Sequence, residues 1–136
     1  METLVFDNDI TVMYVAAKTF PAGVMDAFKK LHSLVPMDVS RKFFGLSRPE
    51  GDGGIQYKAA AEVQSPGEGE KLGFETLVLR KGEYICVTIK DFMKDVQAIG
   101  ATFQQMIQRP DIDPQGYCVE WYFNDKDVRC MIRLDK

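Results

Sequence analysis

The sequence predicts an α+β domain made of two β-α-β-β repeats, arranged with pseudo-twofold symmetry in one antiparallel sheet. Three observations predict this class. The same order of apolar periods, first alternating, then helical, then alternating twice, occurs in each half of the chain. A polar segment rich in Gly and Pro, residues 64–73, lies between the halves. At 136 residues, the chain is long enough to bury one core without disulfides or metals.

We therefore expect residues 1–136 to form a single domain, with repeat one at about 8–63, a linker at 64–73 and repeat two at about 74–136. Both helices are expected to cover one side of the sheet. The other side is then left to form a central groove, and seams of this kind are favoured positions for small-molecule sites.

In the first half, residues 10–18 have the alternation of a strand. A helix is expected to begin near Pro21, since proline suits the first helical turn, and to end at Pro36. Two strands should follow, near 40–48 and 54–63. The apolar stripe of the helix, at steps of four and three, consists of Val24, Phe28, Leu31 and Val35.

The second half repeats this order. A strand is expected at 83–90 and a helix near 92–108, which Pro110 ends. Strands near 117–124 and 127–134 should form a hairpin with a short polar turn. The apolar stripe of this helix consists of Phe92, Val96, Ile99, Phe103 and Met106.

One constant difference in residue number relates the two halves. It pairs apolar positions through the strand, the helix and the hairpin: Ile10 with Ile85, Val24 with Ile99, Phe28 with Phe103, Phe44 with Val119 and Tyr57 with Ile132. A fixed register of this kind favours a duplicated unit. Chance matching of apolar residues is the alternative.

Charge and composition exclude several classes. A net charge of −3 with scattered basic residues argues against nucleic-acid binding by this chain alone. No apolar run approaches the roughly 20 residues that a membrane-spanning helix needs, so no membrane span is expected. The acidic N-terminus does not resemble a signal peptide, and we therefore expect a cytoplasmic protein.

With one histidine, His32, and no CxxC spacing, we expect no metal and no cofactor. The three cysteines, expected as free thiols, are Cys86, Cys118 and Cys130.

The run from residue 117 to residue 123 holds one carboxylate, Glu120, among aromatic and apolar neighbours. Removing water from an unpaired carboxylate costs on the order of several kcal/mol, so the protein must solvate, neutralise or pair it. Period two places Glu120, Cys118 and Tyr122 on one face, which we expect to point into the groove. The opposite, helix-facing set is expected to consist of Tyr117, Val119, Trp121 and Phe123.

Two interpretations of Glu120 stay open. It could be a solvated carboxylate on the wet face of an antiparallel sheet. It could instead be the counter-charge of an organic cation, to which each surrounding ring face would add roughly 0.5–2 kcal/mol. The same choice between a structural position and a groove wall applies to Trp121 and Tyr84.

Other residues could complete a groove. Gly45 is the residue that the constant offset pairs with Glu120, and its missing side chain could leave room. Tyr57 precedes three alanines, which either leave space above the sheet or pack closely under a helix. Because Phe43 and Phe44 are neighbours, one should be core and the other could line the groove. The candidate ligand-binding residues are therefore Glu120, Tyr122, Tyr57, Trp121, Phe43, Phe44, Gly45 and Tyr84.

Four short motifs occur in order along the chain: Phe43-Phe44-Gly45-Leu46, Gly54-Ile55-Gln56-Tyr57, Lys81-Gly82-Glu83-Tyr84 and Val119-Glu120-Trp121-Tyr122. In this order and spacing they resemble the GyrI-like effector-binding family, also called the AraC-type or bacterial transcription activator effector-binding domain. The resemblance implies two β-α-β-β repeats around a groove that binds bulky, often cationic aromatic compounds. It assigns recognition to a buried Glu, matched by Glu120, and to the Tyr two residues on, Tyr122.

The resemblance thus implies a stand-alone relative of multidrug-sensing regulators that binds an aromatic or cationic effector or drug, with Glu120 as counter-charge. Two alternatives remain: a hydrolase of small electrophilic compounds with Glu120 as general acid or base, and an inhibitor that binds gyrase or another protein. Whether the chain is an enzyme is left undecided, with binding favoured. A homodimer or a separate regulatory protein partner is compatible with each of these three hypotheses.

Overall fold

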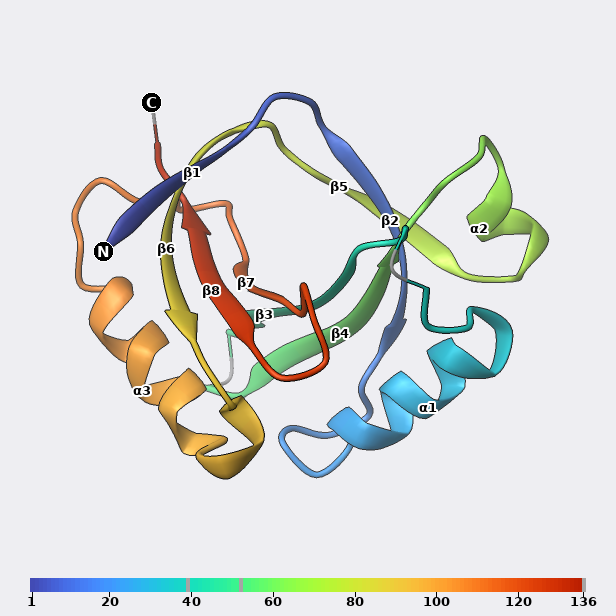
Figure 1. The fold of residues 1–136 in the computed structure, drawn as a ribbon, viewed down its shortest axis with the longest axis horizontal. Coiled ribbons are helices and arrows are strands. Elements are labelled where there is room, and N and C mark those ends of the chain that lie inside the picture. The colour runs from blue at the N-terminus through green and yellow to red at the C-terminus, as the bar shows by residue number, and fades with distance from the viewer. Residues whose placement is uncertain (39, 52, 136) are drawn as a thin grey trace.

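The computed structural model describes residues 1–38, 40–51 and 53–135. A single curled sheet of eight antiparallel strands forms a half-barrel, accompanied by three α-helices, which is the predicted α+β class (Figure 1). The strands are β1 (Glu2–Phe6), β2 (Ile10–Ala16), β3 (Phe43–Pro49), β4 (Ile55–Glu62), β5 (Glu75–Leu79), β6 (Gly82–Ile89), β7 (Cys118–Trp121) and β8 (Val128–Arg133). Their order across the sheet is β1-β6-β8-β7-β3-β4-β2-β5. The helices are α1 (Val24–Leu34), α2 (Glu68–Lys71) and α3 (Gln97–Met106), and η1 (Phe92–Lys94) is a 3₁₀ turn.

The six predicted strands all occur, with ends shifted by a few residues. The first helix begins at Val24 rather than near Pro21. The reason is local: residues 19–23 close a turn in which the Gly23 amide donates to the Thr19 carbonyl at 3.1 Å. Leu31 and Val35 of its predicted stripe are fully buried.

The single helix predicted over 92–108 is wrong, because the chain breaks it into η1 and α3. Between η1 and α3, Asp95 has non-helical backbone angles (φ −150°, ψ 72°), so the helix cannot continue through this residue. The stripe of α3 keeps Ile99 and Phe103 in the core. Phe92 leaves that stripe and is free to pack elsewhere.

Three elements were not predicted: β1, β5 and, inside the expected linker, α2. The two strands carry the same tetrapeptide, Glu-Thr-Leu-Val, at residues 2–5 and 75–78. Each strand pairs with the first main strand of the opposite half, β1 with β6 and β5 with β2. Phe6, after the first tetrapeptide, faces Gly82, and Leu79, after the second, faces Ile10.

The two halves share one order of elements, but their spacing is not constant. Gly45 on β3 faces Glu120 on β7, which are the two positions that the constant offset pairs. Gly45 also faces Ala59 within its own hairpin, and the offset would therefore place Leu134 opposite Glu120. Glu120 faces Cys130 instead, because the second hairpin is shorter. The constant offset thus fails in the last strand. It also fails in the first, because Ile10 and Ile85, which it pairs, pack on opposite faces of the sheet. The duplication itself stays a prediction.

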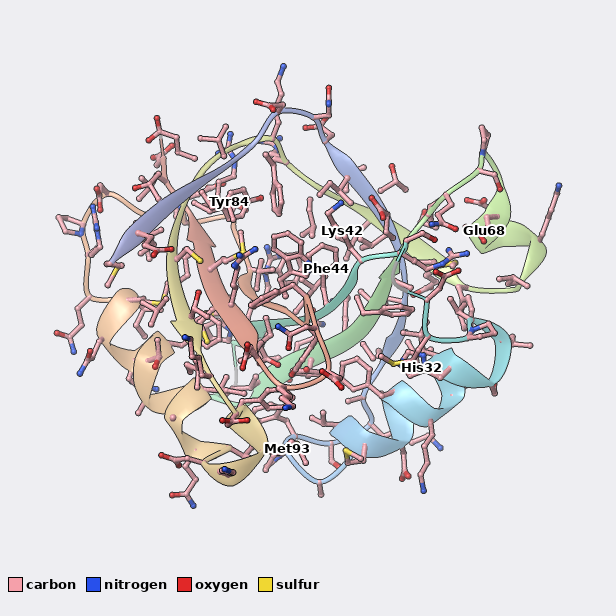
Figure 2. All side chains as sticks on the ribbon, viewed as in Figure 1. His32, Lys42, Phe44, Glu68, Tyr84 and Met93 are labelled. Carbon is pink, nitrogen blue, oxygen red and sulfur yellow. The ribbon has the colours of Figure 1, made fainter. Side chains whose placement is uncertain are left out.

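The curl gives the sheet two differently filled faces. One face carries α1, packed on Met13 and Ala59, and α3, packed on Ile85 and Cys130. Figure 1 shows both helices outside the curl. The inner face is filled by a cluster whose members all come from strands: Phe6, Val12, Phe44, Leu46, Ala60, Leu79, Tyr84, Cys86, Val119 and Met131. In Figure 2, Phe44 and Tyr84 lie inside the curl, whereas His32 lies outside it, on α1.

Candidate functional site

The site is centred on Glu120, in the middle of the sheet on the face that carries the helices. Its side chain is only 7% exposed. The carboxylate oxygen Oε1 accepts a hydrogen bond of 2.9 Å from the Tyr57 hydroxyl and a second, shorter one from the Tyr122 hydroxyl. Among the described residues, no cationic side chain forms an ion pair with Glu120. The charge is therefore bound by neutral donors alone.

Gly45 makes this arrangement possible. A Cβ atom at Gly45 would lie 1.9 Å from the Tyr57 hydroxyl oxygen and 2.7 Å from Oε1 of Glu120. Both distances are far below van der Waals contact, so a side chain at this position cannot coexist with the present positions of Tyr57 and Glu120. The room that Gly45 leaves is thus occupied by the protein's own hydrogen-bonded pair.

Burial controls the protonation of the group. Desolvation raises the pKa of the Glu120 carboxyl above its ordinary value, although the hydrogen bonds from Tyr122 and Tyr57 act in the opposite direction. Desolvation and the neighbouring Glu120 raise the pKa of both tyrosines, so the phenols remain hydrogen-bond donors. Burial also raises the pKa of Cys118 to about 11, which keeps its thiol neutral.

Phenylalanine rings from three separate segments surround the two tyrosines. Phe28 of α1 meets Tyr57 at 6.3 Å and Tyr122 at 5.8 Å between ring centroids, both edge to face. Phe92 of η1 packs on Tyr122 at 5.4 Å, and Phe20, before α1, stacks on Tyr57 at 5.7 Å. These contacts build an aromatic enclosure over Glu120.

The structure brings only part of the predicted site together. Glu120, Tyr122, Tyr57 and Gly45 are in mutual contact, as described above. Phe43 lies on the same face but packs against His32, at 4.9 Å between ring centroids.

The other candidates lie on the inner face of the sheet. Trp121 contacts Phe44 at 6.3 Å between ring centroids, and Tyr84 packs on Phe6 at 5.1 Å. The side chains of these three predicted residues, Trp121, Phe44 and Tyr84, therefore point away from the Glu120 carboxylate. The predicted assignment of the two faces was wrong. The face expected to carry the helices is the inner face of the curl, and the face expected to be an open groove carries α1 and α3. The curl of the sheet explains the error, because it buries an apolar face without any helix.

Three contributors were missed as site residues: Phe20, Phe28 and Phe92. Phe28 was assigned to the core stripe of its helix, and Phe92 to the stripe of a helix that is broken in the structure. Asp95, which ends η1, was the available signal for that break, because aspartate is unfavourable inside a helix.

The enclosure is closed in this structure. Two cavities lie elsewhere, one of about 650 Å³ beside the β1–β2 turn and one of about 320 Å³ beside β5, and Glu120 lines neither. The described residues contain no cluster of three or more His, Cys, Asp or Glu side chains suited to a metal ion. None of the helices in the described part of the chain is long and apolar enough to cross a membrane.

No protein-family model matches the chain, and no curated protein matches it. Solved structures do. An integron cassette protein from the mobile metagenome of Vibrio cholerae aligns over 98% of this chain and 94% of its own, at 15% identity and a TM-score of 0.70. The protein SAV2435, solved with bound tetraphenylphosphonium, aligns over 97% of this chain and 93% of its own, at 12% identity and a TM-score of 0.66.

A third structure, a Staphylococcus aureus protein classed by name with bacterial transcription regulation, covers 98% of this chain and 99% of its own, at 14% identity and a TM-score of 0.57. At these identities the likeness establishes a shared fold. The fold therefore occurs in a protein that binds a lipophilic cation and in one connected by name with transcription.

Proposed function

We propose that this chain binds bulky, lipophilic aromatic cations, with Glu120 as the counter-charge. The observation that carries the proposal is a 7% exposed carboxylate held by two phenols, with no cationic partner among the described side chains, beneath a set of aromatic rings. No positive charge from the described part of the protein balances this carboxylate. The cation bound to SAV2435, which has the same fold, supports this choice of ligand class.

The aromatic rings that pack over Glu120 in the closed state would also contact a bound cation. Aromatic faces attract organic cations by roughly 0.5–2 kcal/mol each, more when the site is dry. The folded chain already carries the cost of removing water from Glu120, so a cation gains the full attraction of a desolvated carboxylate. Small inorganic cations would gain less binding free energy, because they lose strong hydration that phenyl rings cannot replace.

Binding requires the enclosure to open at its rim. Phe28 is the ring that contacts both tyrosines, so separating α1 from η1 would expose the carboxylate. Phe20 is 42% exposed and Met93, at the tip of η1, is 70% exposed, so both segments offer apolar surface to an approaching ligand. We infer that the ligand takes the place of the Phe28 ring over Tyr122.

A matched pair of ligands tests the proposal. Tetraphenylphosphonium should raise the melting temperature of the protein by several degrees at a concentration about 100 times its Kd, since a ligand bound at that excess stabilises the fold by about 2.7 kcal/mol. Neutral triphenylphosphine oxide, with similar rings and no charge, should cause a much smaller shift. Equal shifts from both compounds would show that the rings bind and the carboxylate does not.

A second candidate function is hydrolysis of small electrophilic compounds. The raised pKa of Glu120 favours it, because a carboxyl group titrating nearer neutrality can pass a proton to or from water. The neighbouring thiol of Cys118, with its pKa raised to about 11, is a poor nucleophile. Turnover of an epoxide or activated ester that disappears in Glu120→Gln would favour this candidate over simple binding.

The wider assignment rests on the same proposal. We place the chain beside GyrI-like, AraC-type effector-binding domains as a duplicated single-domain ligand binder that acts in the cytoplasm. The repeated Glu-Thr-Leu-Val strands and their corresponding pairings support the duplication. The net charge of −3 supports a role without direct nucleic-acid contact, in which any control of transcription passes through a separate regulatory partner or a homodimer.

A further inference from the structure

We propose a second ligand site, for small organic anions, in the cavity of about 320 Å³ at the inner face of the sheet. The cavity lies between β5 and the loop at residues 113–117, on the side of the sheet opposite Glu120. Three arginines line it, Arg48, Arg80 and Arg133, together with the rings of Tyr84 and Tyr117. In a chain with a net charge of −3, this is a local excess of positive charge.

Two of the three guanidinium groups have no carboxylate partner among the described residues. Arg133 donates to Asp113 at a distance of 3.2 Å. Asp113 is the one acidic side chain among the described residues that line the cavity. Arg48 lies 3.9 Å above the Tyr117 ring and donates to the Gln115 carbonyl. Arg80 is exposed at the cavity and makes no described side-chain contact. Arg48 and Arg80 therefore have donors available for an anion.

Lys58 adds a buried positive charge behind the cavity. It is 7% exposed, and no described carboxylate lies within ion-pair distance of it. On the inner face, the strand registers align Lys58 with Leu46 and Leu46 with Val119, which lines the cavity. The Lys58 ammonium donates to the side-chain oxygen of Gln56 at 2.5 Å. It also lies 3.5 Å from the Tyr117 hydroxyl and 5.2 Å from the centroid of that ring.

A buried ammonium without a carboxylate is costly unless something compensates its charge. Here the neutral oxygen of Gln56, the ring of Tyr14 at 5.2 Å, and the hydroxyl and ring of Tyr117 compensate part of it. Tyr117 is also the ring on which Arg48 stacks. Two cations thus lie on one aromatic ring at the cavity wall. An anion in the cavity would relieve their repulsion, and this is the independent reason for assigning a ligand to the site.

The lining also defines the chemistry of the ligand. Guanidinium groups bind carboxylate and phosphate oxygens with two parallel hydrogen bonds. Leu77, Leu79 and Val119 supply apolar lining beside the tyrosines, so the anionic group should be attached to an apolar ring. A cavity of this volume is at the small end of ligand sites, which favours a single-ring acid or phosphate ester.

Calorimetric titration with benzoate, phenyl phosphate, inorganic phosphate and neutral benzamide tests the site. We expect saturable binding of benzoate or phenyl phosphate with a Kd below about 1 mM, and which of the two binds more tightly distinguishes a carboxylate from a phosphate ligand. Benzamide and inorganic phosphate should bind at least about tenfold more weakly, because each lacks one of the two recognised parts. The amide resonances of Gly116 and Tyr117 should shift with the same saturation curve.

Variants connect the binding to these residues. Arg80→Gln should weaken the anion at least about tenfold while leaving the melting temperature and tetraphenylphosphonium binding unchanged, so the two sites are tested separately. Lys58→Met should act in the same direction, and exposed Lys71→Gln on α2 is the matched loss of charge that should have no effect. No saturable binding by the wild type up to about 10 mM, binding of inorganic phosphate as tight as phenyl phosphate, or undiminished binding by Arg80→Gln would each overturn the proposal.

Discussion

Glu120→Gln is expected to weaken tetraphenylphosphonium binding at least about tenfold, which corresponds to about 1.4 kcal/mol. The substitution keeps the shape of the side chain and an oxygen that can accept from Tyr57 and Tyr122, and it removes only the charge. Because no other described carboxylate contacts these phenols, nothing in the enclosure can replace that charge. Titration calorimetry of both proteins at one pH and one salt concentration measures the difference.

The controls separate a counter-ion from a packing residue. Triphenylphosphine oxide should bind wild type and Glu120→Gln within about threefold of each other, because a neutral ligand gains little from a carboxylate. Glu50→Gln removes one charge from an exposed turn and should leave both affinities unchanged. If Glu120→Gln weakens the neutral and the cationic ligand equally, Glu120 supports the shape of the enclosure and does not recognise charge.

Gly45→Ala is expected to destabilise the fold by about 1–3 kcal/mol and to abolish tight cation binding. The added methyl group would lie 1.9 Å from the Tyr57 hydroxyl, which must then leave Glu120. Tyr57 is 2% exposed and stacked on Phe20, so it has little room to move. The room expected beside Gly45 is thus not empty, and an added side chain collides with buried groups.

A double-mutant cycle identifies the cause. Tyr57→Phe removes the atom that the new methyl group meets most closely, so Gly45→Ala should cost less in the Tyr57→Phe background than in wild type. Gly51→Ala is the matched control, because a Cβ there meets nothing within 4 Å. Denaturant unfolding measures all four free energies. Additive costs for the two substitutions would contradict the proposed collision.

The alternation of side chains along the strands predicted much of the site. It placed Glu120 and Tyr122 on one face, and the comparison of the halves placed Gly45 opposite Glu120, which the register of β3 and β7 reproduces. Alternation could not say which apolar face receives helices. Both faces carry side chains that pack in a core, Trp121 and Phe44 on one and Cys118 and Tyr122 on the other, and only the curl of the sheet decides between them.

The remaining errors also have physical causes. The strands β1 and β5 are short, and each is stabilised by pairing with the opposite half, as Phe6 pairs with Gly82. A window along the chain cannot detect pairing between residues so distant in sequence, although the repeated tetrapeptide was a usable signal. Phe92 reached the enclosure because Asp95, which has non-helical backbone angles, separates η1 from α3.

The titration of the Glu120 carboxyl carbon by NMR, with and without tetraphenylphosphonium, tests the central claim most directly. Without ligand, burial should hold the pKa above that of an ordinary glutamate, so the protonated form is the more stable one until the pH rises through the raised pKa. A bound cation favours the ionised form, so its presence should lower the pKa, and by linkage cation affinity should fall as the pH falls through that value. Triphenylphosphine oxide should not lower it. A midpoint that stays unchanged while the cation is bound would contradict the account.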